Sequence, residues 1–204
     1  MHLLKRIGNW CRRFRHRCGY GVHSPSDFFL ITSVIYEAGE YYAYRSLRDS
    51  APPASLPHYR GKVNRLLFRL VNHFRPATLL EAGTGNGDAL RHMRAARPSM
   101  RAVSVEADAS GLSVRPDRLK GKTVDFLHIG FTPYYKEVFE AVFPLLHPGS
   151  CVVVGGIYDS PEKQAWWKEL QADERVRISF DLYDIGILLF EEKRFKQDYI
   201  VNFF

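Results

Sequence analysis

Apolar residues recur at helical intervals through the first third of the chain. A helix is predicted to begin after Ser24, which can cap a helix start and is followed by proline, and to end near Asp49. A proline-rich loop comes next, because proline does not fit inside a helix. A second helix is predicted over 61–74, with an apolar stripe that leaves Arg65 and Arg69 outside it.

From Pro76 onward, short apolar runs alternate with helical segments. The runs predict buried strands, and the last two predict an antiparallel pair. The expected strands are 77–82, 101–106, 124–129, 151–154, 177–182 and 185–190, and the expected helices are 88–96, one from Pro133 and one from Ser160. This alternation predicts an α/β fold, a doubly wound and mostly parallel sheet with helices on both faces. In the last helix Trp166 and Trp167 are adjacent, so we expect only one of them to face the core.

The turn between the first of these strands and its helix is rich in glycine. Residues 81–88 read Glu-Ala-Gly-Thr-Gly-Asn-Gly-Asp, in which glycines let the backbone approach a ligand and free amides at the helix start favour polar or anionic groups. About twenty residues further on, Glu106 ends the next strand, where a carboxylate can accept hydrogen bonds from both ribose hydroxyls. Asp88 stands where a dinucleotide fingerprint has its third glycine, which disfavours a nicotinamide dehydrogenase.

These residues resemble motif I of the class I S-adenosylmethionine-dependent methyltransferases. The similarity follows the order of a bacterial branch related to small-molecule O-methyltransferases and covers most of residues 19–200. The segments that carry it are 19–25, 81–87, 124–129, 145–149, 157–162 and 181–187. The resemblance implies a Rossmann-like sheet and S-adenosylmethionine as cofactor. The cofactor-binding residues that it implies are Glu81, Gly83, Thr84, Gly85, Asn86 and Gly87 for the methionine part and Glu106 for the ribose.

The segment after Glu106 is short for this fold. Only 17 residues separate Glu106 from Val124, where a helix, a strand and often another helix belong, and a crossover alone takes a dozen or more residues. At most a short strand near 112–114 fits, so we predict a sheet that is shortened after its second strand. In the family this region walls the adenine, and the resemblance therefore implies an incomplete adenine wall.

The acidic ligands of the metal-dependent O-methyltransferases are missing at the matching positions. Gly130 follows one strand, Gly155 and Gly156 follow another, and glycine offers no side-chain oxygen to a hard cation. We therefore expect no catalytic metal and no carboxylate base at these places. Methyl transfer can proceed without a metal, because positioning of donor and acceptor can supply about 7–11 kcal/mol.

The catalytic candidates are side chains near the carboxyl ends of strands, where open α/β sheets place their ligands. His128 can titrate near neutral pH, although a histidine within an apolar strand is more often a satisfied core residue than a base. Tyr158 and Asp159 follow the strand 151–154, and aromatic packing is the competing interpretation for the tyrosine. His147 precedes Pro-Gly in a turn and is expected to be exposed.

The excess positive charge lies at the N-terminus. Of a net charge of +7, residues 1–20 contribute six Lys/Arg and no acid, while the remainder has 23 basic and 22 acidic side chains. Trp10 and Phe14 are interleaved with these arginines at near-helical spacing. One interpretation is an arm that binds nucleic acid or an acidic membrane surface; the other is an amphipathic helix that packs both aromatics on the protein and exposes its arginines. We favour the second, because one basic helix without a recognised binding module is weak support for the first.

The composition is that of a globular protein, with 46% hydrophobic and 25% charged residues among 204. The sequence contains no apolar run long enough to span a bilayer, and its three cysteines show no metal-ligand spacing and argue against a disulfide framework. We therefore expect a cytoplasmic protein. Aromatic residues, including the terminal Tyr199, Phe203 and Phe204, are compatible with a homodimer.

We predict an N-terminal basic segment and helical extension over 1–60 and a methyltransferase-like domain over 61–204. Two functions fit this organisation. The first is a metal-independent, S-adenosylmethionine-dependent methyltransferase with an unknown acceptor, which predicts cofactor binding that Glu106→Ala weakens. The second is a catalytically inactive relative that binds a partner or a metabolite, or nucleic acid through residues 1–20.

Overall fold

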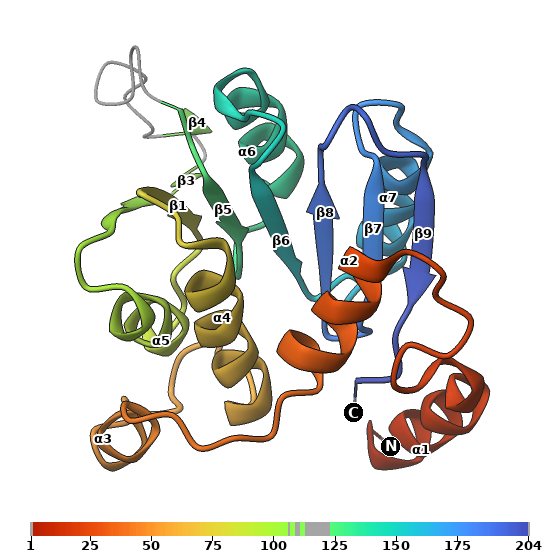
Figure 1. The fold of residues 1–204 in the computed structure, drawn as a ribbon. Helices are drawn as coiled ribbons and strands as arrows, with labels where there is room; N and C mark the ends of the chain where they lie inside the picture. Colours follow the sequence, from red (N-terminus) through yellow and green to blue (C-terminus); the bar gives the residue numbers. More distant parts are fainter. Residues whose placement is uncertain (1, 106, 109–110, 113–122, 204) are drawn as a thin grey trace.

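The computed structural model describes residues 2–105, 107–108, 111–112 and 123–203, with side chains from residue 7 onward and outside 106–122. A central sheet lies between two helical layers (Figure 1). One face is covered by α2 (Pro25–Phe29), α4 (Gly61–Phe74) and α5 (Asp88–Ala96). The other face is covered by α6 (Tyr135–Val142) and α7 (Pro161–Ala172). This is the predicted doubly wound α/β fold, and the helix expected over 61–74 has those bounds.

The described part of the chain contributes seven strands to this sheet, in the order β2-β1-β5-β6-β8-β7-β9. Neighbouring strands are parallel except for β8, which runs antiparallel to both β6 and β7, as predicted for the terminal pair. The strands are β1 (Thr78–Ala82), β2 (Arg101–Val105), β5 (Phe126–Ile129), β6 (Cys151–Gly155), β7 (Ile178–Asp181), β8 (Ile185–Leu189) and β9 (Gln197–Ile200). β9 is not among the predicted strands, and it pairs in parallel with β7 at the edge of the sheet.

Within the described residues, β2 forms the opposite edge of the sheet, in agreement with a sheet shortened after its second strand. Two short strands, β3 (Ala107–Asp108) and β4 (Gly111–Leu112), pair with each other and form a separate two-stranded sheet. The strand expected near 112–114 therefore appears only as Gly111–Leu112, and the rest of that expectation lies outside the described residues.

The core has two halves, one on each face of the sheet. Leu79, Phe126 and Val153 point to the α4 face, while Leu80, Leu127 and Val152 point to the α6 face, and all six are fully buried. Adjacent strand residues alternate between faces, so a strand covered on both sides has to be apolar throughout. This explains why the central strands read as unbroken apolar runs in the sequence.

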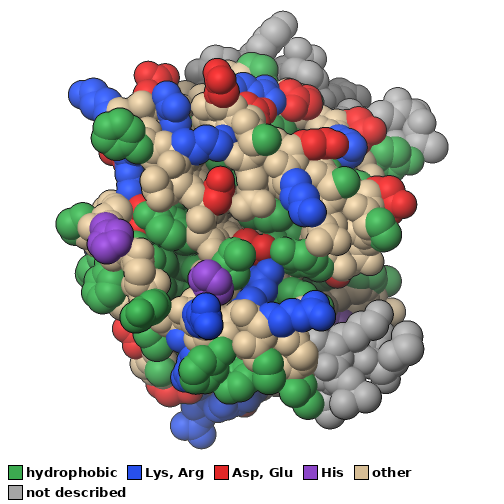
Figure 2. Space-filling view, turned by 90° about the vertical axis from the view of Figure 1, so that its right-hand side faces the viewer, with side chains coloured by type: hydrophobic (Ala, Val, Ile, Leu, Met, Phe, Trp, Pro, Cys, Tyr) green, Lys and Arg blue, Asp and Glu red, His purple; other side chains and the backbone are tan. Residues whose placement is uncertain are grey.

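The N-terminal segment differs from the interpretation that we favoured. It forms α1 (His2–Arg12) and a 3-10 turn η1 (Phe14–His16), yet Trp10 and Phe14 remain exposed, with 39% and 51% of their surface open to solvent. Of the two arginines between them in the chain, Arg12 is exposed and Arg13 is buried. The segment is therefore attached through a basic side chain, and part of its apolar side faces outward. In Figure 2, hydrophobic and basic side chains lie next to each other on the lower part of the visible face.

The helix predicted between Ser24 and Asp49 is broken into three pieces. Ser24 caps α2 as expected, a π-helical segment η2 (Leu30–Ile35) follows, and α3 (Tyr44–Asp49) forms after an irregular stretch. Arg69 ends η2 by donating from Nε to the Val34 carbonyl at 2.6 Å and from Nη2 to the Ile35 carbonyl at 3.0 Å. The prediction that Arg69 lies off the buried stripe of α4 is therefore wrong, because its side chain crosses to η2 and is only 5% exposed.

Two further expectations about aromatic residues are corrected. Trp166 and Trp167 are both buried, because Trp166 contacts Tyr135 of α6 and the ring of Trp167 covers Gly186 of β8. Phe203 is buried at 1% exposure, and Tyr199 is half-buried with its hydroxyl donating to Asp27 at 3.0 Å. These two terminal aromatics consequently give no support to a homodimer. The extension also shares its core with α4 and the sheet through Leu30 and Ile35, so the boundary at residue 60 stays a prediction.

Among the helices of the described residues, none is both long enough and apolar enough to cross a membrane.

Candidate functional site

The glycine-rich turn lies where the strand order of the sheet reverses. β1 has β2 on one side and β5 on the other, and chain connections leave it in opposite directions. In open α/β sheets the crevice at the carboxyl ends of such strands is the usual ligand site. The turn 83–87 extends from that end of β1 and leads into α5, as the sequence predicted.

All three glycines of the turn adopt left-handed backbone conformations, with φ of +76° at Gly83, +58° at Gly85 and +80° at Gly87. Gly83 lies so close to the next loop that an added Cβ would stand 2.6 Å from the backbone of Phe131. A Cβ on Gly85 would overlap the Pro57 carbonyl oxygen, and the amide of Asn86 donates to that same oxygen at 3.0 Å. The loop before α4 therefore packs directly on the glycine turn.

A buried polar chain starts from Glu81 at the end of β1. The Glu81 Oε1 atom is 3.1 Å from Nδ1 of His128 on β5, and Nε2 of His128 is 3.2 Å from the hydroxyl of Tyr59. Glu81 and His128 are both fully buried. Strand register explains their contact, because Glu81 and His128 are direct partners in the β1–β5 pairing. Both residues are candidates from the sequence, but no sequence pattern connects them, and Tyr59 is not among the predicted site residues.

The second oxygen of Glu81, Oε2, is buried and has no hydrogen-bond partner among the described residues. The hydroxyl oxygen of Thr84, in the glycine turn, is in the same situation. A buried polar atom without a partner is destabilising, so native proteins usually satisfy such atoms with protein, water or ligand. Two of the predicted cofactor-binding side chains therefore offer unused hydrogen-bonding capacity to a ligand.

Tyr59 fills the space that Gly155 leaves open at the end of β6. Its hydroxyl lies against the Gly155 backbone, where any Cβ would overlap it, and its ring packs on Phe131 with centroids 4.5 Å apart. Burial, followed by the negative charges of Glu81 and Asp159, raises the pKa of Tyr59. Asp159 folds back over Gly156, so these two glycines are covered by a phenol and a carboxylate of the chain itself.

The structure separates Tyr158 from this chain of residues and places it in a second cluster. Its hydroxyl donates to Asp181 Oδ2 at 2.6 Å, and Arg13 donates to both Asp181 carboxylate oxygens at 2.8 and 3.0 Å. The Arg13 guanidinium also lies 5.3 Å from the Tyr158 ring centroid, and Tyr158 stacks on Tyr183. Burial, then the neighbouring Asp181, raises the pKa of Tyr158 to about 12.

Among the described residues, the remaining candidates singled out in the sequence do not join either cluster. His147 is half-buried rather than simply exposed, and its Nε2 atom is 2.9 Å from Asp125 Oδ1. Burial acts to raise the pKa of Asp125, but hydrogen bonds from the Thr78 amide, then from His147 and then from the Ala77 amide together hold that pKa below its usual value. The predicted ribose ligand Glu106 lies outside the described residues. Across the described side chains, no three His, Cys, Asp or Glu residues are grouped as a metal site.

Solved structures with a similar fold include several methyltransferases. An O-methyltransferase from Bacillus cereus in complex with S-adenosylhomocysteine (SAH) is 15% identical, with a TM-score of 0.53, and the alignment covers 74% of this chain and 92% of that one. TomG, the O-methyltransferase from Streptomyces achromogenes in complex with S-adenosylmethionine (SAM), is 18% identical, with a TM-score of 0.51 over 74% and 91% of the two chains.

A methyltransferase from Geobacter sulfurreducens is 14% identical, with a TM-score of 0.54 over 75% of this chain and 91% of that one. At these identities the similarity establishes the fold that the sequence resemblance implied. No protein-family model and no curated protein matches the sequence.

Proposed function

We propose that the protein binds S-adenosylmethionine or its demethylated product at the glycine turn and acts as a metal-independent methyltransferase. The observation that carries the proposal is the buried Glu81, whose Oε2 atom has no partner among the described residues although it lies at the end of the switch-point strand. An ammonium group is the natural partner for such an oxygen. The fold and the bound cofactors of its structural neighbours add support.

The side chains at the glycine turn suit the methionine part of the cofactor, but the space in front of the turn is occupied by other residues of the chain. Glu81 and Thr84 each have an oxygen free for a ligand. The amide of Asn86, however, donates to Pro57, and the Phe131 ring packs on Gly85. Binding therefore requires that the loop around Pro57 move away from the turn.

When bound, S-adenosylmethionine supplies an electrophilic methyl group on a sulfonium. The chain's own contribution is to position the acceptor and to take its proton. With Glu81 ionised, Nδ1 of His128 carries the hydrogen and Nε2 accepts from the Tyr59 hydroxyl. During methyl transfer, the proton of the acceptor hydroxyl would pass to Tyr59, and the Tyr59 proton would pass to His128.

Calorimetric titration with S-adenosylmethionine and SAH tests the binding step, with NAD as a ligand control. We expect micromolar binding of the first two, weakened at least tenfold by Glu81→Gln and by Thr84→Val, the latter chosen because it nearly preserves shape. Glu137→Gln on the exposed side of α6 is the matched control. Glu106→Ala tests the ribose assignment.

An activity assay tests the proton path. We expect the protein to release SAH when it is given a panel of phenols, and we expect Tyr59→Phe to lose this activity while it still binds the cofactor.

The packing of Pro57 and Phe131 on the glycine turn supports the alternative of an inactive relative. In that case, neither ligand produces heat or a thermal shift at millimolar concentration. That outcome rejects the methyltransferase proposal and identifies the loop before α4 as the element that has replaced the cofactor.

We also infer that the N-terminal segment is an interaction surface for single-stranded nucleic acid. Trp10 and Phe14 are exposed, pack edge to face 5.3 Å apart, and have the Arg17 guanidinium over both rings. Exposed aromatics beside arginines suit base stacking and phosphate contact. Because Arg13 is buried, deleting residues 1–20 would disturb the fold. The sharper variant is Trp10→Ala combined with Arg12→Gln and Arg15→Gln, which should abolish salt-dependent binding of oligonucleotides without changing the melting temperature.

A further inference from the structure

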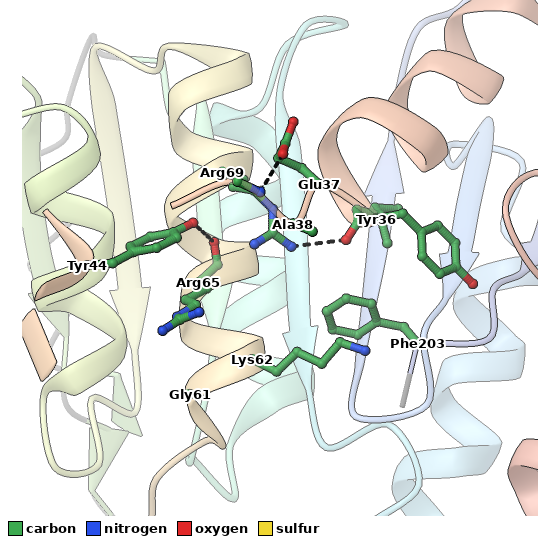
Figure 3. Close-up of a pocket in the computed structure, with 11 residues that line it drawn as sticks. Tyr36, Glu37, Ala38, Tyr44, Gly61, Lys62, Arg65, Arg69 and Phe203 are labelled. Atoms are coloured by element: carbon green, nitrogen blue, oxygen red, sulfur yellow. Dashed lines mark hydrogen bonds between the residues drawn. The ribbon is translucent and has the colours of Figure 1, made fainter. Parts of the chain in front are cut away.

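A cavity of about 530 Å³ lies on the α4 face, apart from the glycine turn. It opens between the first three turns of α4, the chain leaving η2 and Phe203 (Figure 3). This volume lies within the range of small-molecule sites. The residues that line it include Ile35, Tyr36 and Phe203 as apolar or aromatic walls and Arg65 and Arg69 as cations.

Arg69 is the most informative of these residues. Its side chain is 95% buried, and Nε and Nη2 are used by the carbonyls of Val34 and Ile35. Figure 3 shows the remaining nitrogen, Nη1, turned away from the Ile35 bond, into the space beside Tyr44 and Arg65. Among the described residues, no carboxylate forms an ion pair with Arg69. A guanidinium cannot lose its charge, so a buried one without a carboxylate partner favours an anion beside it.

Arg65 stands one helical turn from Arg69 on the same side of α4. Like charges at this spacing repel each other, and an anion between them would remove that repulsion. The Arg65 guanidinium lies 4.9 Å from the Tyr44 ring centroid, which is a cation–π contact. Arg65 also forms an ion pair with Glu40 at 3.3 Å. The Glu40 side chain is 67% exposed, so solvent weakens this ion pair.

The acids near the cavity leave these arginines available. Glu37 lines the cavity, but its Oε1 atom accepts from the amide of Gly39 at 2.6 Å and caps the local turn. Lys62 lies at the rim, with its ammonium 4.1 Å from the Phe203 ring centroid. The cationic part of the cavity is thus bordered by aromatic surface on both sides.

We propose that this cavity binds a small molecule that joins an oxyanion, carboxylate or phosphate, to a flat apolar body. The oxyanion lies between Arg65 and Arg69, where paired N–H donors match its geometry. The flat body lies against the ring of Phe203, on the other side of the arginines from Tyr44. The site does not depend on methyltransferase activity, and it brings no residue of the glycine turn into contact with the ligand.

The test is calorimetry on the full chain with benzoate and phenyl phosphate as probes. Benzamide, which has the shape of benzoate without its charge, and inorganic phosphate, which lacks the apolar body, are the comparison ligands. We expect at least one aromatic anion to bind with submillimolar affinity and both comparison ligands to bind at least tenfold more weakly. The stronger of the two aromatic anions then identifies carboxylate or phosphate as the natural group.

Arg65→Gln is the decisive variant, because Arg65 is only half-buried and its loss leaves the Arg69 contacts to η2 in place. It should weaken binding of the aromatic anion about tenfold, while Arg48→Gln, an exposed arginine on α3, should leave it unchanged. The proposal is overturned if neither aromatic anion binds at 10 mM or if both variants reduce the affinity equally, since the latter means unspecific charge attraction. A titration with S-adenosylmethionine on the same variants separates this outcome from failure of the methyltransferase proposal.

Discussion

Arg13 and Asp181 are 168 residues apart in the chain and form a buried, two-point ion pair. The Nη1–Oδ1 distance is 2.8 Å and the Nη2–Oδ2 distance is 3.0 Å, and Nη1 also donates to the backbone carbonyl of Asp181. Only 9% of Arg13 and 3% of Asp181 reach solvent. A single arginine thus ties the N-terminal segment to the end of β7, while its basic neighbours stay in water.

Because of this ion pair, we expect Arg13 to contribute to the stability of the fold. Arg13→Ala leaves the carboxylate of Asp181 buried without its counter-charge, so we expect the free energy of unfolding to fall by about 3 kcal/mol. Arg12→Ala removes an exposed arginine from the same segment and should change it by less than about 0.5 kcal/mol. Urea denaturation followed by circular dichroism measures both. Equal losses in the two variants would mean that the segment is not docked through Arg13.

The phenol of Tyr158 should make the free energy of unfolding depend on pH in the alkaline range. Burial and the neighbouring Asp181 raise its pKa to about 12 in the folded protein, from the ordinary tyrosine value of about 10. Between these two values the folded state keeps a proton that the unfolded chain has lost, so this contribution is complete below pH 10 and is lost as the pH rises towards 12. Because Tyr158 is only half-buried, we expect about 1 kcal/mol after allowance for solvent screening.

The measurement is the unfolding free energy of the wild type and of Tyr158→Phe at several pH values from 9 to 12. The difference between them should narrow as the pH rises, because the phenylalanine variant has no proton to lose. A difference that stays constant would show that the phenol titrates normally in the folded protein.

The sequence was sufficient to predict the elements that local patterns determine. The helix 61–74 and the turn from β1 into α5 carry complete signals in a few neighbouring residues, namely an apolar stripe and a run of glycines. β9 could not be found in this way. Its residues 197–200 read Gln-Asp-Tyr-Ile, without alternation, and they form a strand because β7 offers a free edge.

In the candidate site, too, contacts between residues that are distant in the sequence could not be predicted from local patterns. Glu81 and His128 were each recognisable from their strands, but their contact depends on the register between β1 and β5. Tyr59 comes from an irregular loop and reaches His128 across 69 residues of sequence, so no local signal marks it. Arg13 is likewise indistinguishable from Arg12 by composition or spacing. The tertiary partner decides which of them is buried.

Two glycines allow a direct test of the packed turn. Gly85 has a φ of +58°, and its Cβ would overlap the Pro57 carbonyl, so Gly85→Ala should lower the unfolding free energy by about 1–3 kcal/mol. Gly61 begins α4 with open space around it, and Gly61→Ala should be neutral or stabilise the protein by up to about 1 kcal/mol. Thermal and urea unfolding compare the two. A tolerated alanine at 85 would contradict the contact between the Pro57 loop and the turn.

The three free cysteines report on the opening of the core. Cys11 and Cys18 are exposed, whereas Cys151 is buried at the start of β6, between Phe126 of β5 and Leu189 of β8. Burial also raises the pKa of the Cys151 thiol and so suppresses the reactive thiolate. We expect two thiols to react rapidly with a disulfide reagent in native buffer and the third to react only as the sheet opens. Across a urea series, the labelling of Cys151 should therefore follow the loss of β-sheet signal, and in Arg13→Ala its midpoint should move to lower urea. A Cys151 that reacts as fast as Cys11 in native buffer would place β6 at an accessible edge and contradict its central position in the sheet.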